Sequence, residues 1–318
     1  MQVVNFYSRR KARAFADIYA GKLVDPDLTP ELWRDGLDTW IVQTYLRLRQ
    51  QSDLPFHCTL SAKFMPDAIN VAHRDEASPW FRPASCYTVV IRADRPPVLS
   101  ADQVVVQNPG QIGPNHTFIP FWPQPGLVPR VPLPTARFRN LAFLGRPEHL
   151  SSAFTDGGLQ RSLAAMGINL ELRRDRWYDY RDIDVVFAVR SEHPAMIASK
   201  PASKLINAWH AGVPAILGRE PAYQLTGRPG VDYLEADTPA EMLAAITRLR
   251  DDPDFYQRMI TAGKIQAELH SVAAVAKRWI EALSGDLAPD HSSGRFRFVR
   301  QRWRALQEHL LARQWRDR

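Results

Sequence analysis

The stretch that decides the fold is residues 184–217, which read DVVFAVRSEHPAMIASKPASKLINAWHAGVPAIL. It begins with Asp184–Val189, an almost continuous apolar run typical of a strand buried on both faces. Pro201 then marks the start of a helix that we expect to run to about Ala211, and Pro214–Leu217 is the next predicted strand. This strand–helix–strand order predicts a parallel, doubly wound sheet, in which ligands bind beyond the carboxyl ends of the strands.

The same alternation extends on both sides of this stretch. A strand that precedes it is followed by Gly145-Arg146. A helix capped by Thr238 and a last long helix come after this stretch. We expect the long helix to break near Gly263. The predicted elements are strands at Asn140–Leu144, Asn169–Leu172 and Asp232–Leu234, and helices at Gly157–Met166, Pro239–Arg250 and Pro253–Leu283.

The amino-terminal third is less regular. A helix is predicted over Pro30–Arg49, because Thr29 can cap it and Pro30 suits the first helical position. The segment Pro96–Pro134 holds ten of the 25 prolines, which predicts loops that form part cleft wall and part linker. Strand-like runs lie at the amino end, His57–Ser61, Ala68–Ala72, Tyr87–Arg92 and Gln103–Gln107, so we expect an α/β layer structure here too.

Composition narrows the functional classes. The 318 residues are 45% hydrophobic and 24% charged, which is ordinary for a globular protein of about two domains. The sequence contains no uncharged apolar run of eighteen or more residues, so no membrane span is predicted. At the amino end an apolar run precedes the basic residues, which is the reverse of the order in a secretory signal. Cys58 and Cys86 lack metal-site spacing and are expected to be reduced thiols in a cytoplasmic protein.

The net charge of +7 is concentrated at the carboxyl end. Residues 295–318 contain eight arginines against Glu308 and Asp317, which gives +6 and leaves +1 for residues 1–294. A nearly neutral body argues against nucleic-acid binding. Within this tail, Val299, Trp303, Leu306 and Leu310 recur at helical spacing, so the tail is predicted to be an amphipathic helix. Two alternatives stay open: the stripe lies on an anionic membrane surface, or it packs against the body.

Two lysines near the predicted start of the 201–211 helix point to a ligand. Lys200 and Lys204 face the positive end of the helix dipole, where a cation alone is mildly unfavourable. A bound diphosphate would meet both ammonium groups, free backbone amides and the Ser203 hydroxyl. The alternative is that both lysines are solvated surface residues.

Three further pieces carry a family resemblance. Residues 211–216 (AGVPAI), 230–233 (GVDY) and 249–253 (LRDDP) follow one another as in the donor-binding domain of GT-B glycosyltransferases. The chain from Asp184 to about Gly263 resembles that domain, and Gly145-Arg146 looks like the loop that opens it, whose basic residue reaches the nucleotide diphosphate in relatives. The resemblance implies two Rossmann-like domains facing across a cleft.

The match departs from many retaining GT-B enzymes at two positions. Aligning on residues 211–214 puts Ser199 and Asn207 where those enzymes carry glutamates. Residues 203–208 (SKLINA) instead resemble the Glu-Lys-Leu/Ile segment of fucosyltransferases, with Ser203 in place of the glutamate.

Other candidate site residues follow strand ends. Arg190 would point at the phosphates, or be a surface ion-pair partner. Glu220 and Tyr223 would meet ribose or sugar hydroxyls, or form a helix start with a packed tyrosine. An inverting transfer needs a base to deprotonate the acceptor hydroxyl, for which His73, Asp75 and Glu76 are candidates, although a charged turn also explains them. Asn108, His116 and Gln124 are expected to line the cleft.

The resulting prediction is a metal-independent glycosyltransferase of the hexosyltransferase class, which moves a sugar from a nucleotide-diphosphate donor to a hydroxyl of a glycan or lipid-linked glycan. No cofactor is expected besides the donor substrate. The alternative is a non-catalytic nucleotide-sugar-binding or scaffold protein. The predicted domains are 1–134 for the acceptor, 135–285 for the donor and 286–318 as the basic tail; the expected location is the cytoplasm or the inner membrane face, in polysaccharide biosynthesis.

Overall fold

The computed structural model describes residues 1–78, 80, 82–83, 85–131, 138–289 and 297–316. The chain forms two compact units, each built around one parallel sheet. Unit 1 comprises 1–120, 199–201 and 272–318, and unit 2 comprises 121–198 and 202–271. Unit 1 therefore includes residues 272–285, which the sequence places in the donor domain, and residues 286–318, which it places in a separate tail. In the described residues, no helix combines the length and apolar character needed to cross a membrane.

The sheet of unit 1 is parallel throughout. All six residues of β3 (Ala68–His73) are buried, which is expected of a central strand covered on both faces. The chain passes from β1 (Gln2–Tyr7) to β2 on one side and then to β3 on the other, so the direction of winding switches between β1 and β3. In spatial order the strands are β2 (Phe56–Ser61), β1, β3, β4 (Tyr87–Ile91), β5 (Gln103–Val106) and β6 (His116–Phe118).

The helix predicted over Pro30–Arg49 is wrong only in its first third. A short 3-10 turn forms at Pro30–Leu32, and continuous helix begins at Gly36, with a π-helical segment at Asp38–Gln43 followed by the α-helix α2 (Thr44–Arg49). Every residue of the π-helix is buried, which is consistent with tertiary packing overriding local helix propensity. The proline-rich segment, predicted to be loop, also contains strand β6. The remaining short helices of this region are α1 (Ala16–Tyr19) and the 3-10 turns Pro26–Leu28 and Pro109–Gln111.

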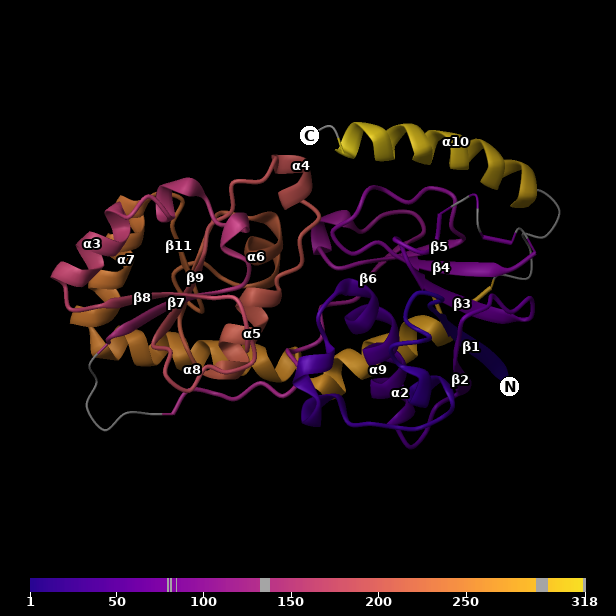
Figure 1. Cartoon of the computed structure of the whole chain (residues 1–318), viewed down its shortest axis with the longest axis horizontal. Coiled ribbons are helices and arrows are strands. Elements are labelled where there is room, and N and C mark those ends of the chain that lie inside the picture. The colour runs from indigo at the N-terminus through magenta and orange to yellow at the C-terminus, as the bar shows by residue number, and fades with distance from the viewer. Residues whose placement is uncertain (79, 81, 84, 132–137, 290–296, 317–318) are drawn as a thin grey trace. The chain divides into compact units, whose positions relative to one another are not determined.

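Unit 2 has a second parallel sheet that follows the predicted rhythm closely (Figure 1). The chain runs from β7 (Asn140–Leu144) to β8 on one side and then to β9 on the other, so the winding switches between β7 and β9. In spatial order the strands are β11 (Leu234–Glu235), β10 (Ala215–Leu217), β9 (Val185–Ala188), β7 and β8 (Asn169–Arg173). The helices are α3 (Gly158–Ala165), α4 (Pro194–Ile197), α5 (Ser203–Ala211), α6 (Pro221–Thr226), α7 (Pro239–Asp251) and α8 (Pro253–Leu269), with 3-10 turns at Pro147–His149 and Ser152–Phe154.

The last long helix breaks later than predicted. α8 continues through Gly263 and ends at Leu269, and α9 (Val272–Ser284) begins three residues further on. A Cβ atom at Gly263 would lie 2.7 Å from the indole Cδ1 of Trp209. The glycine therefore permits close contact between α8 and α5 and is not a helix breaker.

The tail forms a helix, α10 (Arg297–Arg316), that packs on unit 1 beside β4 and β5 (Figure 1). Its contact face contains Ala305, Glu308 and Ala312, all buried. Glu308 is fully buried and accepts hydrogen bonds from the backbone N–H groups of Leu99 and Ser100, each at 3.0 Å. The guanidinium groups of Arg74 and Arg82 lie 3.0 and 3.9 Å from its carboxylate.

The helix is attached to the body, as the second alternative drawn from the sequence predicts, but not through the described half of the stripe. Leu306 and Leu310 are 54% and 53% exposed. From the sequence alone, Glu308 counts only as a negative charge within a basic tail. The side chains of Val299 and Trp303, together with residues 295 and 317–318, lie outside the described part of the tail.

Candidate functional site

The switch point of unit 2 brings together the main predicted donor-site residues. Gly145 follows β7, Arg190 follows β9, and Glu220 lies after β10 as the residue preceding α6. These three strands are neighbours in the sheet, so the loops after their carboxyl ends form one edge. Open α/β sheets bind ligands at this edge, beside the switch point.

Lys204 lies in the first turn of α5 and reaches back to this edge. Its ammonium group donates a hydrogen bond to the carbonyl of Leu144 and lies 4.6 Å from the centre of the Phe143 ring. Burial, together with the nearby charge of Arg190, lowers the pKa of Lys204 to about 7. An added negative charge nearby would stabilise the charged form of this lysine.

Gly145 makes room for that lysine. Its φ of +154° is one that residues with a side chain rarely adopt, and a Cβ atom there would lie 3.0 Å from the Lys204 ammonium nitrogen. The following residue, Arg146, is exposed at the start of a 3-10 turn. The loop therefore combines a close backbone approach with an exposed cationic side chain.

Arg190 and Glu220 form a buried ion pair beside Lys204, with side chains 10% and 3% exposed. Burial disfavours the charge on Arg190, but the attraction of Tyr223 and Glu220 outweighs it and raises the pKa. The guanidinium also lies 5.8 Å from the centre of the Tyr223 ring, and burial raises the pKa of that phenol. Arg190 is therefore not a solvated surface residue, and Glu220 and Tyr223 hold it in place.

Three other predicted donor residues lie differently. Helix α5 begins at Ser203, which places Ser203 and Lys204 in its first turn and leaves Lys200 outside the helix. Lys200 belongs to unit 1, where its ammonium group pairs with Asp94 at 2.9 Å. Asn207 is buried, and its side-chain oxygen accepts a hydrogen bond from the backbone N–H of Gln124 at 3.0 Å.

The predicted acceptor-side residues gather at the switch point of unit 1, after β3. The backbone N–H of Asp75 donates to Nδ1 of His73 at 3.2 Å, so the neutral ring carries its proton on Nε2. That ring is 1% exposed, and burial lowers its pKa to about 4. Nε2 faces Gly36, where a Cβ atom would lie only 2.8 Å away.

Asp75 and Glu76 have different surroundings. Asp75 accepts from Nε of Arg95 at 2.9 and 3.1 Å, and its side chain remains 31% exposed. Glu76 accepts from the Ser8 hydroxyl and from the backbone N–H of Arg10 at 2.8 Å, so it anchors the loop after β1. Of the three candidates, Asp75 has the carboxylate that a solvent-borne hydroxyl can reach.

The predicted cleft residues are shared between the units. Asn108 is buried in unit 1, where its side chain accepts from the N–H of Gly110 and donates to the carbonyl of Lys200. His116 begins β6 and its ring Nδ1 lies 2.9 Å from the carbonyl oxygen of Pro114. Gln124 belongs to unit 2 and is tied to Asn207.

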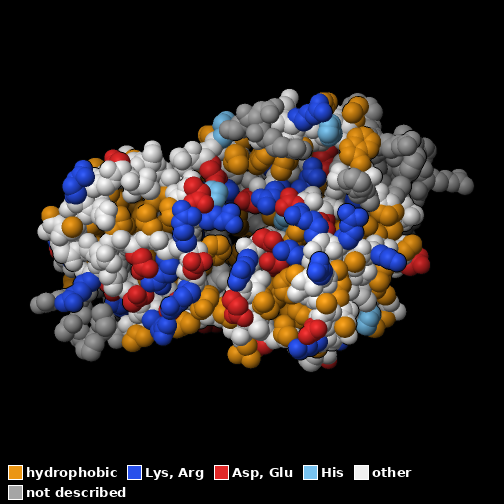
Figure 2. All heavy atoms as spheres, viewed as in Figure 1, with side chains coloured by type: hydrophobic (Ala, Val, Ile, Leu, Met, Phe, Trp, Pro, Cys, Tyr) orange, Lys and Arg blue, Asp and Glu red, His pale blue; other side chains and the backbone are white. Residues whose placement is uncertain are grey.

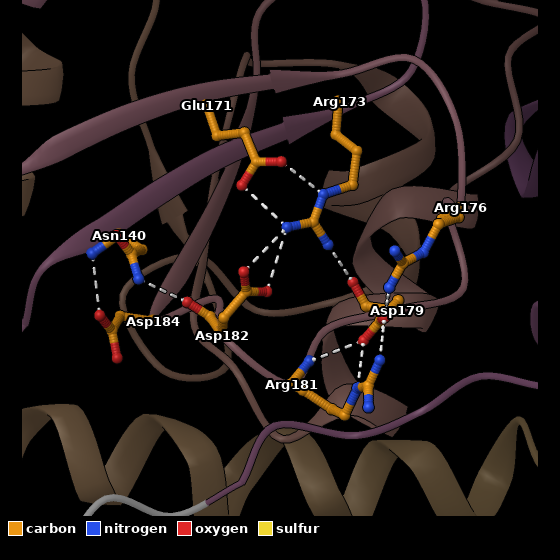
Figure 3. Close-up of polar contacts among 8 residues, drawn as sticks. All are labelled: Asn140, Glu171, Arg173, Arg176, Asp179, Arg181, Asp182 and Asp184. Atoms are coloured by element: carbon orange, nitrogen blue, oxygen red, sulfur yellow. Dashed lines mark hydrogen bonds and ion pairs between the residues drawn. The ribbon is translucent and has the colours of Figure 1, made fainter.

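A second charged cluster, not predicted from the sequence, surrounds the connection from β8 to β9 (Figure 3). Arg173 binds Glu171, Asp182 and the carbonyl of Asp179, while the Asp179 carboxylate binds Arg181 and Arg176. Hydrogen bonds from Arg181, then Arg176, hold the pKa of Asp179 well below its usual range. These residues border a depression of about 580 Å³. Because its charges satisfy one another, we assign the cluster to holding this connection in shape.

Comparison with solved structures identifies the fold. HepE from Anabaena, in complex with UDP and glucose, superposes with a TM-score of 0.55 and 11% identity over 90% of this chain and 100% of that chain. Sucrose-phosphate synthase from Thermosynechococcus elongatus gives 0.55 and 13% identity over 89% and 98%. No protein-family model and no curated protein sequence matches the chain. The two parallel-sheet α/β units have the GT-B fold, as predicted.

Proposed function

We propose that this GT-B chain is a glycosyltransferase that moves a sugar from a nucleotide-diphosphate donor to an acceptor hydroxyl. The observation that carries the proposal is the pair of buried cations, Lys204 and Arg190, beside the switch point of unit 2. HepE, which has a similar fold, was solved with UDP and glucose, and this supports a nucleotide-sugar donor.

The residues of the donor site would act on the leaving group. The bond between the anomeric carbon and the diphosphate oxygen breaks, and the acceptor oxygen forms the new bond. Lys204, Arg190 and the first-turn amides of α5 would stabilise the charge on the diphosphate, with Arg146 at the entrance. Glu220 and Tyr223 would keep Arg190 oriented, and Ser203 would donate its hydroxyl to a phosphate oxygen.

These cations also support transfer without a divalent metal. Charge neutralisation by ammonium and guanidinium groups fulfils the role that a bound ion has in metal-dependent transfer. A bound diphosphate would raise the pKa of Lys204, so that the side chain takes up a proton from solvent and carries a full positive charge. Activity in excess chelator tests this part of the proposal.

On the acceptor side we assign the base to Asp75. Its partly exposed carboxylate would take the proton of the acceptor hydroxyl as that oxygen attacks. His73 carries its own proton on Nε2, and Glu76 is used as an anchor, so neither is as well suited to accept one. Asp75→Asn is expected to abolish transfer while leaving donor binding intact.

The rival is a non-catalytic protein that binds nucleotide sugars. Both proposals predict binding of a nucleoside diphosphate, so binding alone does not separate them. A panel of nucleoside diphosphates in a thermal-shift assay would identify the base, because a ligand of the native state raises its apparent stability. Turnover of the matching nucleotide sugar by the parent and its loss in Asp75→Asn would support the enzyme; binding without any turnover would support the rival.

We also propose peripheral attachment to an anionic membrane through α10. Leu306 and Leu310 are exposed on the face opposite the buried Glu308, and Arg304 and Arg313 are exposed on the same helix. An apolar strip with nearby arginines suits a helix that lies in the plane of an anionic bilayer. This arrangement agrees with a lipid-linked acceptor, and vesicle sedimentation tests it.

A further inference from the structure

The loop after β1, residues 8–15, is strongly basic for its length, with four basic residues in eight. Residues 8–15 contain Arg9, Arg10, Lys11 and Arg13 and no acidic residue, although residues 1–294 together carry only +1. The loop leaves β1 at the point where the winding of the sheet switches to β3. The topology therefore puts a strongly positive segment where an open α/β sheet binds its ligand.

The backbone of this loop is firmly anchored. The Ser8 N–H donates to the carbonyl of Ser61 at 3.1 Å, and Tyr19 donates its hydroxyl to the carbonyl of Ser8. Glu76 holds the Ser8 hydroxyl and the Arg10 N–H. Lys11 pairs with Asp35 and Asp38 at 2.6 and 2.8 Å, which fixes the middle of the loop.

The guanidinium groups, in contrast, are left without ionic partners. Arg9, Arg10 and Arg13 are exposed, and no ion pair joins them within the part of the chain that the structure describes. Basic and acidic side chains lie intermixed on the face drawn in Figure 2. Because Lys11 and the neighbouring Glu76 anchor the backbone of the loop, its three arginines, which have no ion pair among the described residues, are presented to an external anion from a fixed position.

The neighbouring strand end repeats the arrangement. Lys63 follows β2, which pairs with β1 through the register Tyr7↔Ser61. Its carbonyl accepts hydrogen bonds from the side chains of Asn5 and Ser61, at 3.0 and 3.1 Å, while its ammonium group is exposed. Two adjacent loops thus hold their backbones fixed and present exposed cations.

We infer that the four exposed cations of these loops, Arg9, Arg10, Arg13 and Lys63, bind the anionic groups of the acceptor. The acceptor is then an acidic saccharide carrying carboxylates or phosphates. The inference rests on the proposed transfer function, because it places the acceptor on unit 1. Arginine suits either anion, since its planar fork binds two oxygens of a carboxylate or a phosphate. The base proposed above, Asp75, follows β3 at the same switch point.

The test is direct binding by the full chain, without donor. The probes are oligogalacturonate, a phosphorylated malto-oligosaccharide and the neutral malto-oligosaccharide, all of the same length. We expect one or both charged probes to bind and the neutral one to bind at least about tenfold more weakly. The double variant Arg9→Gln/Arg13→Gln should lose about tenfold, or ~1.4 kcal/mol, in affinity for the charged probe.

The matched control is Arg139→Gln/Arg161→Gln, which removes the same charge from exposed positions of unit 2 and should bind as the parent does. Equal losses in the two double variants, equal affinity for charged and neutral probes, or no binding of either charged probe would overturn the inference. Binding to phosphatidylserine vesicles alone, lost in Arg9→Gln/Arg13→Gln, would assign the loop to a membrane instead. UDP titrations of the same variants report on unit 2 separately, so a failure of the donor proposal is recognised by itself.

Discussion

The lowered pKa of Lys204 makes diphosphate binding depend on pH in a specific direction. In the free protein, burial and Arg190 bring this pKa to about 7, so the side chain is mostly charged at pH 6 and mostly neutral at pH 8. A bound diphosphate favours the charged form and raises the pKa again. Binding above pH 7 therefore takes up a proton, and affinity should fall as the pH rises.

The magnitude follows from the titration of the free lysine. With a pKa of about 7, the charged fraction falls from about nine tenths at pH 6 to about one tenth at pH 8. If only the charged form binds well, the dissociation constant rises about tenfold over this range, or ~1.4 kcal/mol. The number of protons taken up per diphosphate at pH 8 should approach one, at roughly 0.9.

Isothermal titration calorimetry of UDP in two buffers of different ionisation enthalpy measures both quantities. Lys204→Arg is the control, because arginine stays charged at every pH used. The phosphate of UDP also titrates, near pH 6, but equally for parent and variant. Proton uptake at pH 8 by the parent and not by Lys204→Arg is expected. Identical pH profiles for the two proteins would refute the placement of Lys204 in the diphosphate site.

Four other outcomes follow from the structure. Gly145→Ala should weaken UDP binding in calorimetry, because the new Cβ atom would displace the ammonium group of Lys204 and strain a φ of +154°. If the donor base is uracil, uridine without phosphates should bind to the variant as it does to the parent. Transfer should continue in excess EDTA; complete loss of activity that magnesium or manganese restores would contradict the metal-independent mechanism. Glu308→Ala should lower the melting temperature, because it leaves Arg74 and two backbone N–H groups without their buried partner, at a cost of about 3 kcal/mol; an unchanged melting temperature would show that α10 is not held as described. Leu306→Ser/Leu310→Ser should reduce sedimentation with phosphatidylserine vesicles and leave the melting temperature unchanged, and vesicle binding equal to that of the parent would remove α10 from the membrane proposal.

Much of unit 2 could be predicted because its central strands, β7, β9 and β10, are almost entirely buried. The strand at Asn140–Leu144 was predicted with its observed limits, and α7 was predicted to within one residue because Thr238 caps it and Pro239 begins it. Such signals are local, so a single sequence carries them. The order of the pieces that resemble GT-B enzymes then fixed the architecture.

The misses are those that depend on residues distant in the sequence. Lys200 shared its motif with Lys204, but Asp94 binds it in unit 1, and nothing near position 200 indicates that partner. The buried environment of Glu308 was equally invisible, because its partners lie some 200 residues earlier. The anchoring of the Ser8–Phe15 loop by Glu76 has the same cause: the sequence identified the charges but not their pairing.

The return of the chain to unit 1 after residue 271 bears on how the protein is made. Unit 1 combines residues 1–120 with α9 and α10, and the Tyr87 hydroxyl bonds to the carbonyl of Ala288 within it. On the ribosome, the residues of unit 2 have all been synthesised before α9 exists, so unit 2 can complete its core first although it comes second in the sequence. Unit 1 must wait for its last helices with its early strands already synthesised. During translation, the amino-terminal segment is therefore the part that most needs protection by chaperones.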